Sequence, residues 1–484
     1  MTSSLPTVLL IGGLDPQGCA GIIADSQTVS SHGCHPVPLI TCLTEQSSKG
    51  LISLGALELS QFNNQYQSAV VDYDIAAIKV GLVPNIEIAQ AVLNIVKQHN
   101  VPVIWDPVLS STSGGVSVSS NVQHFLLKNL LPEISLLTPN TVELAQLTQQ
   151  RNPIHASKRL LELGLNACLV KGGHNDSEWA TDYFIDQSTE FYCYADKQAK
   201  SVRGTGCVLA SSIASNMAIN LDIRDAIVLA KAYLTRGIRD AKSIGPYHVI
   251  AHSNADFELC DMPKLTYSKN LVGHQFNFPS CPQRLGIYPV VDSSDWIRKL
   301  TEEGIKTIQL RIKEASEQQK HNAVQQAVSY CDDSVAFFVN DYWKVAIEHR
   351  AYGVHLGQED LHDANLLEIE QAGLRLGVST HSYWELARAL AVNPSYIALG
   401  PVFETTSKVM PWLPQGVERV EKWTRLLADT YPLVAIGGID QKRAEQLYKT
   451  GVGSVAMISA ITMAKDYKKS LMKLLLLWEG GIEE

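Results

Sequence analysis

Apolar runs and stretches of helical period alternate along most of the chain and divide it into two α/β halves. In the first half, short β-rich runs are separated by segments such as residues 85–99, whose apolar positions recur at helical spacing. Strands that are apolar throughout and separated by helices predict a mostly parallel sheet covered on both faces. The runs are TVLLIGG, AAIKVGL, PVIWDPV, ISLLTPN and ACLVKGG.

Two further patterns follow in the same half. Residues 180–186 and 190–195 alternate apolar and polar positions, which predicts a β-hairpin. The stretch SVRGTGC at residues 201–207 leads into small and apolar residues that predict a helix, and another helix is expected through Arg239.

A second alternation begins after Leu285, and its units can be counted. Each of eight strand-like runs is followed by a helical stretch, the last at residues 463–479. Eight strand–helix units in the 200 residues 285–484 predict a compact (β/α)8 barrel. The runs are LGIYPVV, TIQLRI, VAFFVN, GVHLG, RLGVST, YIALGPV, LVAIGGI and SVAMIS.

Periodicity is lost between the two halves. Residues 256–284 contain Pro, Asn, Ser and isolated aromatics without a clean repeat, which predicts a linker that packs on a neighbour. The expected organisation is therefore an α/β sandwich domain over residues 1–255, a linker over 256–284 and a TIM barrel over 285–484.

Composition narrows the class of partner. Apolar residues at 45% and charged residues at 18% are typical of a soluble globular protein, and the net charge of −9 gives no basic surface for nucleic acid or membrane. The N-terminus lacks a basic segment, and no run is long enough to span a membrane. Nine cysteines without any C-x-x-C spacing favour reduced thiols in a cytoplasm and argue against a cysteine zinc site.

Polar side chains collect where the expected barrel strands end, which is where such barrels carry function. Gln309, Arg311 and Lys313 alternate at the end of the second strand, so we expect them to point the same way. The other strand ends supply Asn340, Asp341, Gln358, Asp360, Ser379, Thr380, His381, Thr405, Ser407, Lys408, Gly437, Gly438, Ile458 and Ser459.

These residue types suit polyphosphate chemistry. Arg311, Lys313 and Lys408 supply cations, and Asp341 and Asp360 are suited to hold one Mg²⁺. The glycines after the seventh strand and the amides at the start of the eighth helix are typical of a phosphate cup, formed by Gly438, Ile458 and Ser459. Two phosphate sites on one rim suggest a substrate pair, one carrying pyrophosphate and the other a monophosphate.

Each residue also has a simpler interpretation when taken alone. Asp341 is suited to cap the helix that follows it, and Gly437 and Gly438 are suited to permit a turn. A single Arg or Lys is usually a solvated surface charge. The functional interpretation is favoured for the set, because the simpler one must hold at seven strand ends at once. For Gln358 and Thr380 the two interpretations are balanced.

The run QLRIK…FFVND…GVHLGQEDL…LGVSTH…YIALGPVFETTSK…AIGGI…ISAI resembles the thiamine-phosphate synthase family over residues 285–461. The resemblance implies coupling of hydroxymethylpyrimidine pyrophosphate to a thiazole phosphate, with release of pyrophosphate. It assigns pyrophosphate binding to Arg311, Lys313 and Lys408 and magnesium to Asp341 and Asp360. It also implies substrate contacts from Gln309, Asn340, Ser379, Thr405 and Ser407, the last replacing the family's usual threonine.

The Gly204–Cys207 turn admits two interpretations. Backbone amides at a helix N-terminus favour an anion, and the same field is expected to lower the pKa of Cys207 toward neutrality. A thiolate there would accept a proton from a substrate hydroxyl during phosphoryl transfer. Alternatively, Gly204, Thr205 and Gly206 form only a turn, and Cys207 is a small core residue.

The motifs GLDPQGCAGIIAD, CLTEQSS, IKVGL, WDPVLSSTSG, LLTPNTVELAQL, LVKGGH and GTGC resemble, in order, the hydroxymethylpyrimidine (phosphate) kinases of the ribokinase-like superfamily. The resemblance implies an ATP-dependent kinase with Cys207 as base and the GTGC turn as anion hole. It places Asp25 and Gln46 on the pyrimidine, and Lys171 and Thr205 near the nucleotide. It places Asp106, Asn140 and Glu143 on the magnesium–phosphate side, although Asp106 also suits a turn and Glu143 a helix surface. The sequence departs from the family pattern at Leu14, Gln17, Cys19, Glu45 and Arg203.

Together the two halves predict a bifunctional enzyme of thiamine biosynthesis that uses ATP as co-substrate and Mg²⁺ as cofactor. Its expected partners are small molecules rather than nucleic acid or membrane, and its expected location is the cytoplasm. The oligomeric state stays open, and a homodimer is one option, because ribokinase-like proteins often dimerise. Two alternatives stay open for the first half: a pyridoxal-type vitamin kinase, which Cys207 disfavours, or a silent ligand-binding domain.

Overall fold

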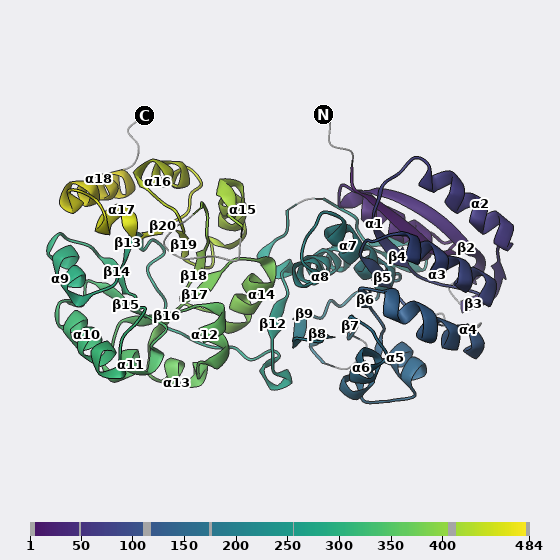
Figure 1. The fold of residues 1–484 in the computed structure, drawn as a ribbon, viewed down its shortest axis with the longest axis horizontal. Helices are drawn as coiled ribbons and strands as arrows, with labels where there is room; N and C mark the ends of the chain where they lie inside the picture. Colours follow the sequence, from purple (N-terminus) through teal and green to yellow (C-terminus); the bar gives the residue numbers. More distant parts are fainter. Residues whose placement is uncertain are drawn as a thin grey trace. The chain divides into compact units, whose positions relative to one another are not determined.

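The computed structural model divides into two compact units, Met1–Gly273 and His274–Glu484. It describes residues 5–47, 50–109, 118–173, 177–254, 256–404 and 413–480. Each unit has its own sheet and its own core, so each is described separately (Figure 1).

The first unit is built on one ten-stranded sheet in the order β12-β9-β8-β7-β6-β5-β4-β1-β2-β3. The pairs from β2 through β1 and β4 to β7 are parallel, and antiparallel strands extend the sheet at both ends. The mostly parallel sheet and the β8–β9 hairpin are therefore confirmed. The strands are β1 Thr7–Leu14, β2 His35–Ser47, β3 Gly50–Ala56, β4 Ile75–Val80, β5 Val103–Trp105, β6 Leu136–Leu137, β7 Ala167–Val170, β8 Trp179–Asp186, β9 Glu190–Asp196 and β12 Lys264–Thr266.

Helices cover this sheet in two groups, which pack in separate apolar clusters. Leu9 and Ile11 of β1 join a large apolar cluster with residues of α2 to α6, whereas Ala24, Val208 and Tyr233 form a separate cluster among α1, α7 and α8. Because successive strand residues point to opposite faces, a strand buried on both sides must be apolar at every position. The helices are α1 Gly21–Ser31, α2 Leu59–Val70, α3 Ile86–Gln98, α4 Ser120–Phe125, α5 Thr141–Thr148, α6 Pro153–Glu162, α7 Thr205–Ala218 and α8 Ile223–Arg239.

The second unit is a closed barrel of eight parallel strands, as expected, in which β13 pairs with β20. Figure 1 shows helices placed around the strands. All strand carboxyl ends meet at one rim, because every neighbouring pair is parallel. The strands are β13 Gly286–Val291, β14 Thr307–Leu310, β15 Ala336–Asn340, β16 Gly353–Leu356, β17 Arg375–Thr380, β18 Tyr396–Leu399, β19 Leu433–Ile436 and β20 Ser454–Met457.

Large aromatic side chains fill the barrel interior. Tyr288, Phe338 and Tyr396 point inward and pack together with ring centroids 5.1–6.0 Å apart. Glycines on the neighbouring strands make room for them: a Cβ at Gly377 would lie 2.1 Å from Tyr396, and one at Gly353 2.5 Å from Phe338. The interior is therefore a packed core and not a channel.

The helices of the second unit follow their strands in turn, and their N-termini lie at the same rim. The final helix expected at residues 463–479 is α18, which begins later than expected, at Tyr467, and follows the short helix α17 that ends at Thr462. The helices are α9 Ser294–Glu302, α10 Glu317–Ser329, α11 Trp343–Glu348, α12 Gln358–Asp363, α13 Leu366–Gln371, α14 Tyr383–Val392, α15 Gly416–Leu427, α16 Gln441–Tyr448, α17 Ser459–Thr462 and α18 Tyr467–Gly480.

Residues 256–284, expected to be a linker, divide between the two units at Gly273. Their β12 pairs antiparallel with β9, so part of this segment extends the first sheet. Leu265 and Phe276 are buried, which accounts for the apolar residues the segment retains. Among the helices that the structure describes, none is both long and apolar enough to cross a membrane.

Candidate functional site

The barrel rim brings most of its expected residues together at one end of the strands. Gln309 is the last inward-pointing residue of β14, and Arg311 and Lys313 follow just beyond the strand. Gln309 is buried and donates through Nε2 to the Tyr288 hydroxyl at 3.1 Å. Arg311 lies close enough to Asp341 and His355 to influence the ionisation of both. Thr405, Ser407 and Lys408 lie outside the described residues.

Asp341 and Asp360 face one another across the ends of β15 and β16. Burial first and the neighbouring Asp360 carboxyl second raise the pKa of Asp341 to about 7, against the opposing charge of Arg311. Asp341 also has a φ of +65°, an unusual conformation for a residue with a Cβ, and accepts a hydrogen bond from the Asn340 side chain. Two crowded carboxyls in a protected place suit a hard divalent cation, so these residues fit Mg²⁺. Asp341 does not supply an N-cap, because Tyr342 occupies that position of α11.

A chain of hydrogen bonds runs across the barrel interior beneath this rim. The Tyr396 hydroxyl lies 2.9 Å from the Tyr288 hydroxyl and 2.7 Å from His355 Nδ1. His355 Nε2 in turn lies 2.8 Å from Ser379 Oγ, so the expected substrate contact is held by a buried imidazole. Burial, together with the positive charges of Arg311 and His381, lowers the pKa of His355 to about 3 and keeps it neutral.

Gln358 and Thr380 have structural partners within the barrel unit. Gln358 donates to the Ser379 carbonyl at 2.6 Å and accepts from Arg388 at 3.1 Å. Thr380 is fully buried and donates to the Ala398 carbonyl at 2.8 Å. Their side chains therefore support the rim at β17 and β18.

The expected phosphate cup lies at the ends of β19 and β20. Gly437 and Gly438 have φ values of +102° and +66°, and a Cβ at Gly438 would lie 2.3 Å from the Glu404 carbonyl oxygen. Only glycine fits this turn without strain. Ile458 is the N-cap of α17 and Ser459 its first residue, so backbone amides point from this helix start toward the rim.

In the first unit, the start of α7 lies against the ends of β5 and β7. Gly204 is the N-cap of α7 with a φ of +77°, and a Cβ there would lie 2.0 Å from the Cys19 carbonyl oxygen. A Cβ at Gly206 would lie 3.0 Å from Lys171 Nζ. The GTGC turn, including Thr205 at the first helical position, is therefore packed beside Lys171, where glycine permits close approach of the backbone.

Lys171 contacts two carboxylates, one just after β5 and one in the first turn of α5. Its ammonium lies 2.5 Å from Asp106 Oδ1 and 3.9 Å from Glu143 Oε2. Burial raises the pKa of Glu143 to about 7 and the charge of Asp106 adds to this shift, although Lys171 opposes it. Two carboxylates share one lysine here, so the cluster has an excess negative charge when both are ionised, which favours a further cation.

Asn140 and Glu143 together cap the start of α5, and Glu143 is buried instead of lying on a helix surface. The Asn140 side chain accepts from the backbone amides of Val142 and Glu143, and the Glu143 carboxylate accepts from the Asn140 amide at 2.7 Å. This capping box fixes the start of α5. A helix cap and a position in the Lys171 cluster are thus combined in one residue, Glu143.

Asp25 lies in α1, completely buried, with both carboxylate oxygens already bonded. Lys79 Nζ donates to one oxygen at 2.7 Å, and the Ser211 hydroxyl donates to the other at 2.7 Å. Gln46 lies on β2, where its carbonyl oxygen accepts from the Gln17 side chain at 3.2 Å. The described contacts therefore do not join Asp25 to Gln46 directly.

Cys207 corrects one sequence prediction. Burial raises the pKa of its thiol to about 12, and the charges of Asp25 and Asp106 add to this effect, whereas Lys79 opposes it. The expected shift toward neutrality is wrong for the protein without substrate, because two carboxylates and burial outweigh the amides of the helix start. Cys207 is therefore a thiol at neutral pH.

Lys79 and His355 were missed by the sequence analysis, although each carried a signal. Lys79 interrupts the apolar run AAIKVGL, and His355 interrupts GVHLG. A charged or titratable residue inside a fully apolar strand must be paired or neutral, and both conditions are met here. The interior tyrosines carried no such signal, since Tyr is common in buried strands.

The sequence models of two protein families match this chain, one in each unit. The model described as phosphomethylpyrimidine kinase matches residues 15–252, and the model described as thiamine monophosphate synthase matches residues 287–461. The two matches occur in the order and place that the motifs indicated.

Relatives and solved structures resemble the two units separately. Thiamine-phosphate synthase of Citrobacter koseri is 51% identical over 211 residues, and that of Salmonella typhimurium 52% over 211; each match covers 43% of this chain and 100% of the relative. The pyridoxal kinase of Staphylococcus aureus, solved with AMP-PCP, has a TM-score of 0.50 and 22% identity over 55% of this chain and 99% of its own. At that identity the likeness supports the fold of the first unit alone.

Proposed function

We propose that this chain is a bifunctional enzyme of thiamine biosynthesis. It belongs to the thiamine-phosphate synthase family through its second half and carries a phosphomethylpyrimidine kinase domain in its first half. The first unit phosphorylates hydroxymethylpyrimidine and its phosphate at the expense of ATP. The second unit joins the resulting hydroxymethylpyrimidine pyrophosphate to a thiazole phosphate. The products are thiamine phosphate and free pyrophosphate. The observation that carries this proposal is the grouping of Arg311, Asp341 and Asp360 at one barrel rim.

In the synthase unit, the bond between the pyrimidine methylene and pyrophosphate breaks, and the thiazole nitrogen forms the new bond to that carbon. The aminopyrimidine is electron-rich and stabilises the cation, so no strong protein base is needed. Arg311, Lys313 and Lys408 are proposed to hold the departing pyrophosphate, and Ser379 and Gln309 to orient the pyrimidine. Asn340, Thr405 and Ser407 are proposed as further substrate contacts, with the second phosphate at Gly438, Ile458 and Ser459.

Asp341 and Asp360 are the residues proposed to hold Mg²⁺. This assignment is supported by the pKa of Asp341, which burial and repulsion from Asp360 raise to about 7. A bound cation would offset that repulsion and favour the ionised form of both carboxyls. Bound Mg²⁺ would supply positive charge that neutralises the pyrophosphate leaving group. Arg311 then adds a fixed guanidinium on the same side, with a fork of donors that matches phosphate oxygens.

In the kinase unit, a substrate hydroxyl attacks the terminal phosphoryl group of ATP near the amides of Gly204, Thr205 and Gly206. Lys171 is proposed to contact the nucleotide phosphates, with Asp106, Asn140 and Glu143 on the metal side. Phosphoryl transfer proceeds through a loose transition state, so the hydroxyl proton is lost late. Because a neutral thiol cannot accept a proton, Cys207 is proposed to lose its own proton to solvent once the substrates are bound. As the thiolate it then accepts the hydroxyl proton while the new bond forms.

The pyrimidine is proposed to bind near Asp25 and Gln46. Because both Asp25 oxygens already accept hydrogen bonds from Lys79 and Ser211, this contact needs a free lone pair on one of them rather than an unbonded oxygen. The nine free cysteines fit the proposed cytoplasmic location, where thiols stay reduced.

One reconstitution tests the whole proposal. Purified protein receives hydroxymethylpyrimidine, ATP, Mg²⁺ and thiazole phosphate, and thiamine phosphate is measured over time. We expect its formation together with consumption of ATP. A parallel reaction supplied with the pyrimidine pyrophosphate isolates the synthase step, and pyridoxal in place of the pyrimidine tests the vitamin-kinase alternative. If thiamine phosphate forms only when the pyrimidine pyrophosphate is supplied, the proposed kinase activity of the first unit is contradicted.

A further inference from the structure

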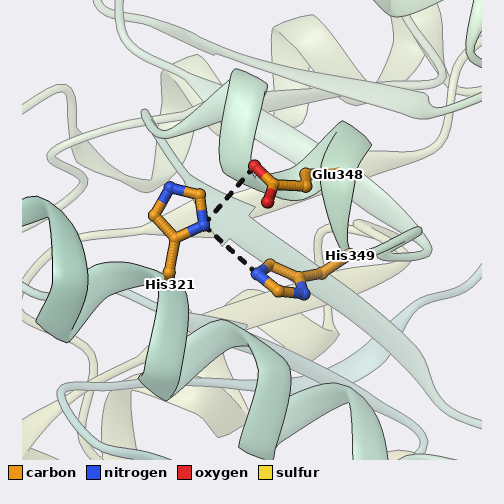
Figure 2. Close-up of side chains that lie close together, drawn as sticks. All are labelled: His321, Glu348 and His349. Carbon is orange, nitrogen blue, oxygen red and sulfur yellow. Dashed lines mark hydrogen bonds and ion pairs between the residues drawn. The ribbon is translucent and has the colours of Figure 1, made fainter.

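We propose that His321, Glu348 and His349 form a binding site for a divalent ion of the Zn²⁺ class on the outside of the barrel. The site lies on the helix layer, on α10 and at the end of α11, and goes beyond the proposed function (Figure 2). Its potential ligand atoms are two imidazole nitrogens and one carboxylate oxygen, and all three lie within 4.8 Å of one another.

The spacing of these atoms fits a tetrahedral ion. His321 Nδ1 lies 3.3 Å from His349 Nε2 and 3.5 Å from Glu348 Oε2. Ligands held at 2.0–2.1 Å from a tetrahedral Zn²⁺ are separated by about 3.3–3.4 Å, which is close to both distances. Figure 2 shows the three side chains converging from two helices on a common point beside the His321 ring.

The end of α11 explains why neighbouring residues can serve one ion. His349 is the C-cap of this helix, and a pair of hydrogen bonds, Arg350 N to Ile347 O at 3.1 Å and Ala351 N to Ala346 O at 3.0 Å, closes the helix. Arg350 has a φ of +53°, so the chain turns sharply after His349. The helix end is thereby fixed, and Glu348 and His349 are turned toward α10.

The charges around the cluster favour a cation. In the part of the chain that the structure describes, Glu348 has His321 as its ion-pair partner and no lysine or arginine. The acidic residue one turn before His321, Glu317, is already paired with Lys320 at 2.6 Å. The cluster therefore offers one uncompensated carboxylate and two imidazoles, and the exposure of Glu348 leaves room for water as a fourth ligand.

The ligand atoms of this site differ from those of the Asp341–Asp360 site at the barrel rim. Imidazole nitrogens suit Zn²⁺, Ni²⁺ or Cu²⁺, whereas Asp341 and Asp360 offer only oxygen, which suits Mg²⁺. An ion bound at the His321–Glu348–His349 site would join α10 to α11, the helices that follow the Arg311 and Asp341 loops. It would therefore stabilise the synthase unit without contacting substrate.

Zinc binding to the full chain tests the proposal. The protein is stripped with a chelator, kept in excess Mg²⁺, and titrated with Zn²⁺ alone by equilibrium dialysis and calorimetry. We expect H321A and H349A each to lose one bound Zn²⁺, or to weaken its binding at least tenfold, and E348Q to weaken it less. The control is H124A, because His124 is an exposed histidine of α4 in the other unit.

Thermal unfolding gives a second readout that does not depend on activity. Zn²⁺ is expected to raise the unfolding temperature of the wild type and of H124A, but not of H321A or H349A. The unfolding temperatures without metal show whether each variant is folded before it is titrated. Equal stoichiometry and equal thermal shifts in all variants would overturn the proposal, as would a zinc site lost in D341N and retained in H321A.

Discussion

Lys79 Nζ lies 2.7 Å from Asp25 Oδ2, and both side chains are at most 1% exposed to solvent. Burial alone would lower the pKa of Lys79, but the charges of Asp25 and Asp106 outweigh it and raise that pKa. The pair joins α1 to β4 directly beneath the α7 helix start. It therefore supports the kinase site and also opposes the rise in the pKa of Cys207.

Replacing Lys79 with Met is expected to destabilise the first unit by about 3–5 kcal/mol, because it leaves the Asp25 carboxylate buried without its partner. Denaturant unfolding measures the loss. The double variant D25L/K79M should recover much of it, since an apolar pair carries no uncompensated charge. As a control, R159A removes the exposed Arg159–Glu162 pair and should cost less than about 1 kcal/mol. Equal losses in K79M and R159A would contradict the buried-pair interpretation.

Cys207 is expected to be unreactive as a nucleophile yet required for phosphorylation. With the pKa of its thiol raised to about 12, alkylation at pH 8 should be slower than at the exposed Cys260. C207A should lower pyrimidine phosphorylation by about 10²–10⁴-fold, the usual contribution of a positioned proton acceptor. Coupling of supplied pyrimidine pyrophosphate should be unchanged in the same variant. Normal phosphorylation by C207A would exclude the thiol from proton transfer.

Arg311 is expected to matter for the synthase reaction alone. R311A should lower thiamine phosphate formation by about 10²–10³-fold, because it removes a fixed positive charge beside the leaving pyrophosphate. ATP consumption with hydroxymethylpyrimidine should stay at the wild-type rate. R298A is the matched control, since Arg298 is exposed on α9 and pairs with Asp295 and Glu302 of the same helix. Equal loss of both activities in R311A would refute independent sites.

The fold was largely readable from the apolar pattern, because parallel strands buried on both faces must be apolar throughout. The eight barrel strands and the β8–β9 hairpin were all predicted. The strands β2 and β3 were not, since the edge hairpin they form carries exposed residues such as Leu43 and Ile52 that break the pattern. The pairing of β12 with β9 was missed as well, because a three-residue edge strand has too few positions to show any period.

The grouping of the candidate residues was predicted better than their electrostatics. Asp341, Asp360 and Arg311 were placed together because parallel strands end at one rim. The pKa of Cys207 was predicted in the wrong direction, since the sequence does not reveal that Asp25 and Asp106 come near the thiol from α1 and β5. The His355–Tyr396 network was missed for the same reason: only the folded barrel shows which inward residues meet on its axis.

Asp341 is expected to make the synthase unit less stable as pH rises when no metal is present. Its pKa is raised from an ordinary value near 3.8 to about 7, so the folded state holds a proton that the unfolded state loses between about pH 4 and pH 7. Stability from this group is thus complete below pH 4 and lost as pH approaches 7. Asp341→Asn should remove this slope and raise the unfolding temperature at pH 7 by a few degrees.

Mg²⁺ is expected to bind at the same two carboxyls, Asp341 and Asp360, and to stabilise the synthase unit. At pH 7.5, Mg²⁺ is expected to raise the unfolding temperature of the wild type, because it offsets the repulsion between Asp341 and Asp360, and to have a smaller effect on D341N. The same variant should lose synthase turnover by orders of magnitude. A wild-type unfolding temperature that is independent of both pH and Mg²⁺ would contradict a metal site at these carboxyls.

His355 is expected to give the opposite dependence on pH. Its pKa is lowered to about 3, so between pH 6.5 and pH 3 the unfolded state binds a proton that the folded state excludes. Stability from this group is therefore present above pH 6.5 and falls as the solution is acidified, partly offsetting the contribution of Asp341. In H355N, which keeps a hydrogen-bonding side chain near Ser379, the acid-side loss should shrink while the slope due to Asp341 remains. NMR of the imidazole ring gives the direct measurement: its signals should not titrate between pH 5 and 8, and a midpoint near 6.5 would show that the ring is solvated rather than locked between Tyr396 and Ser379.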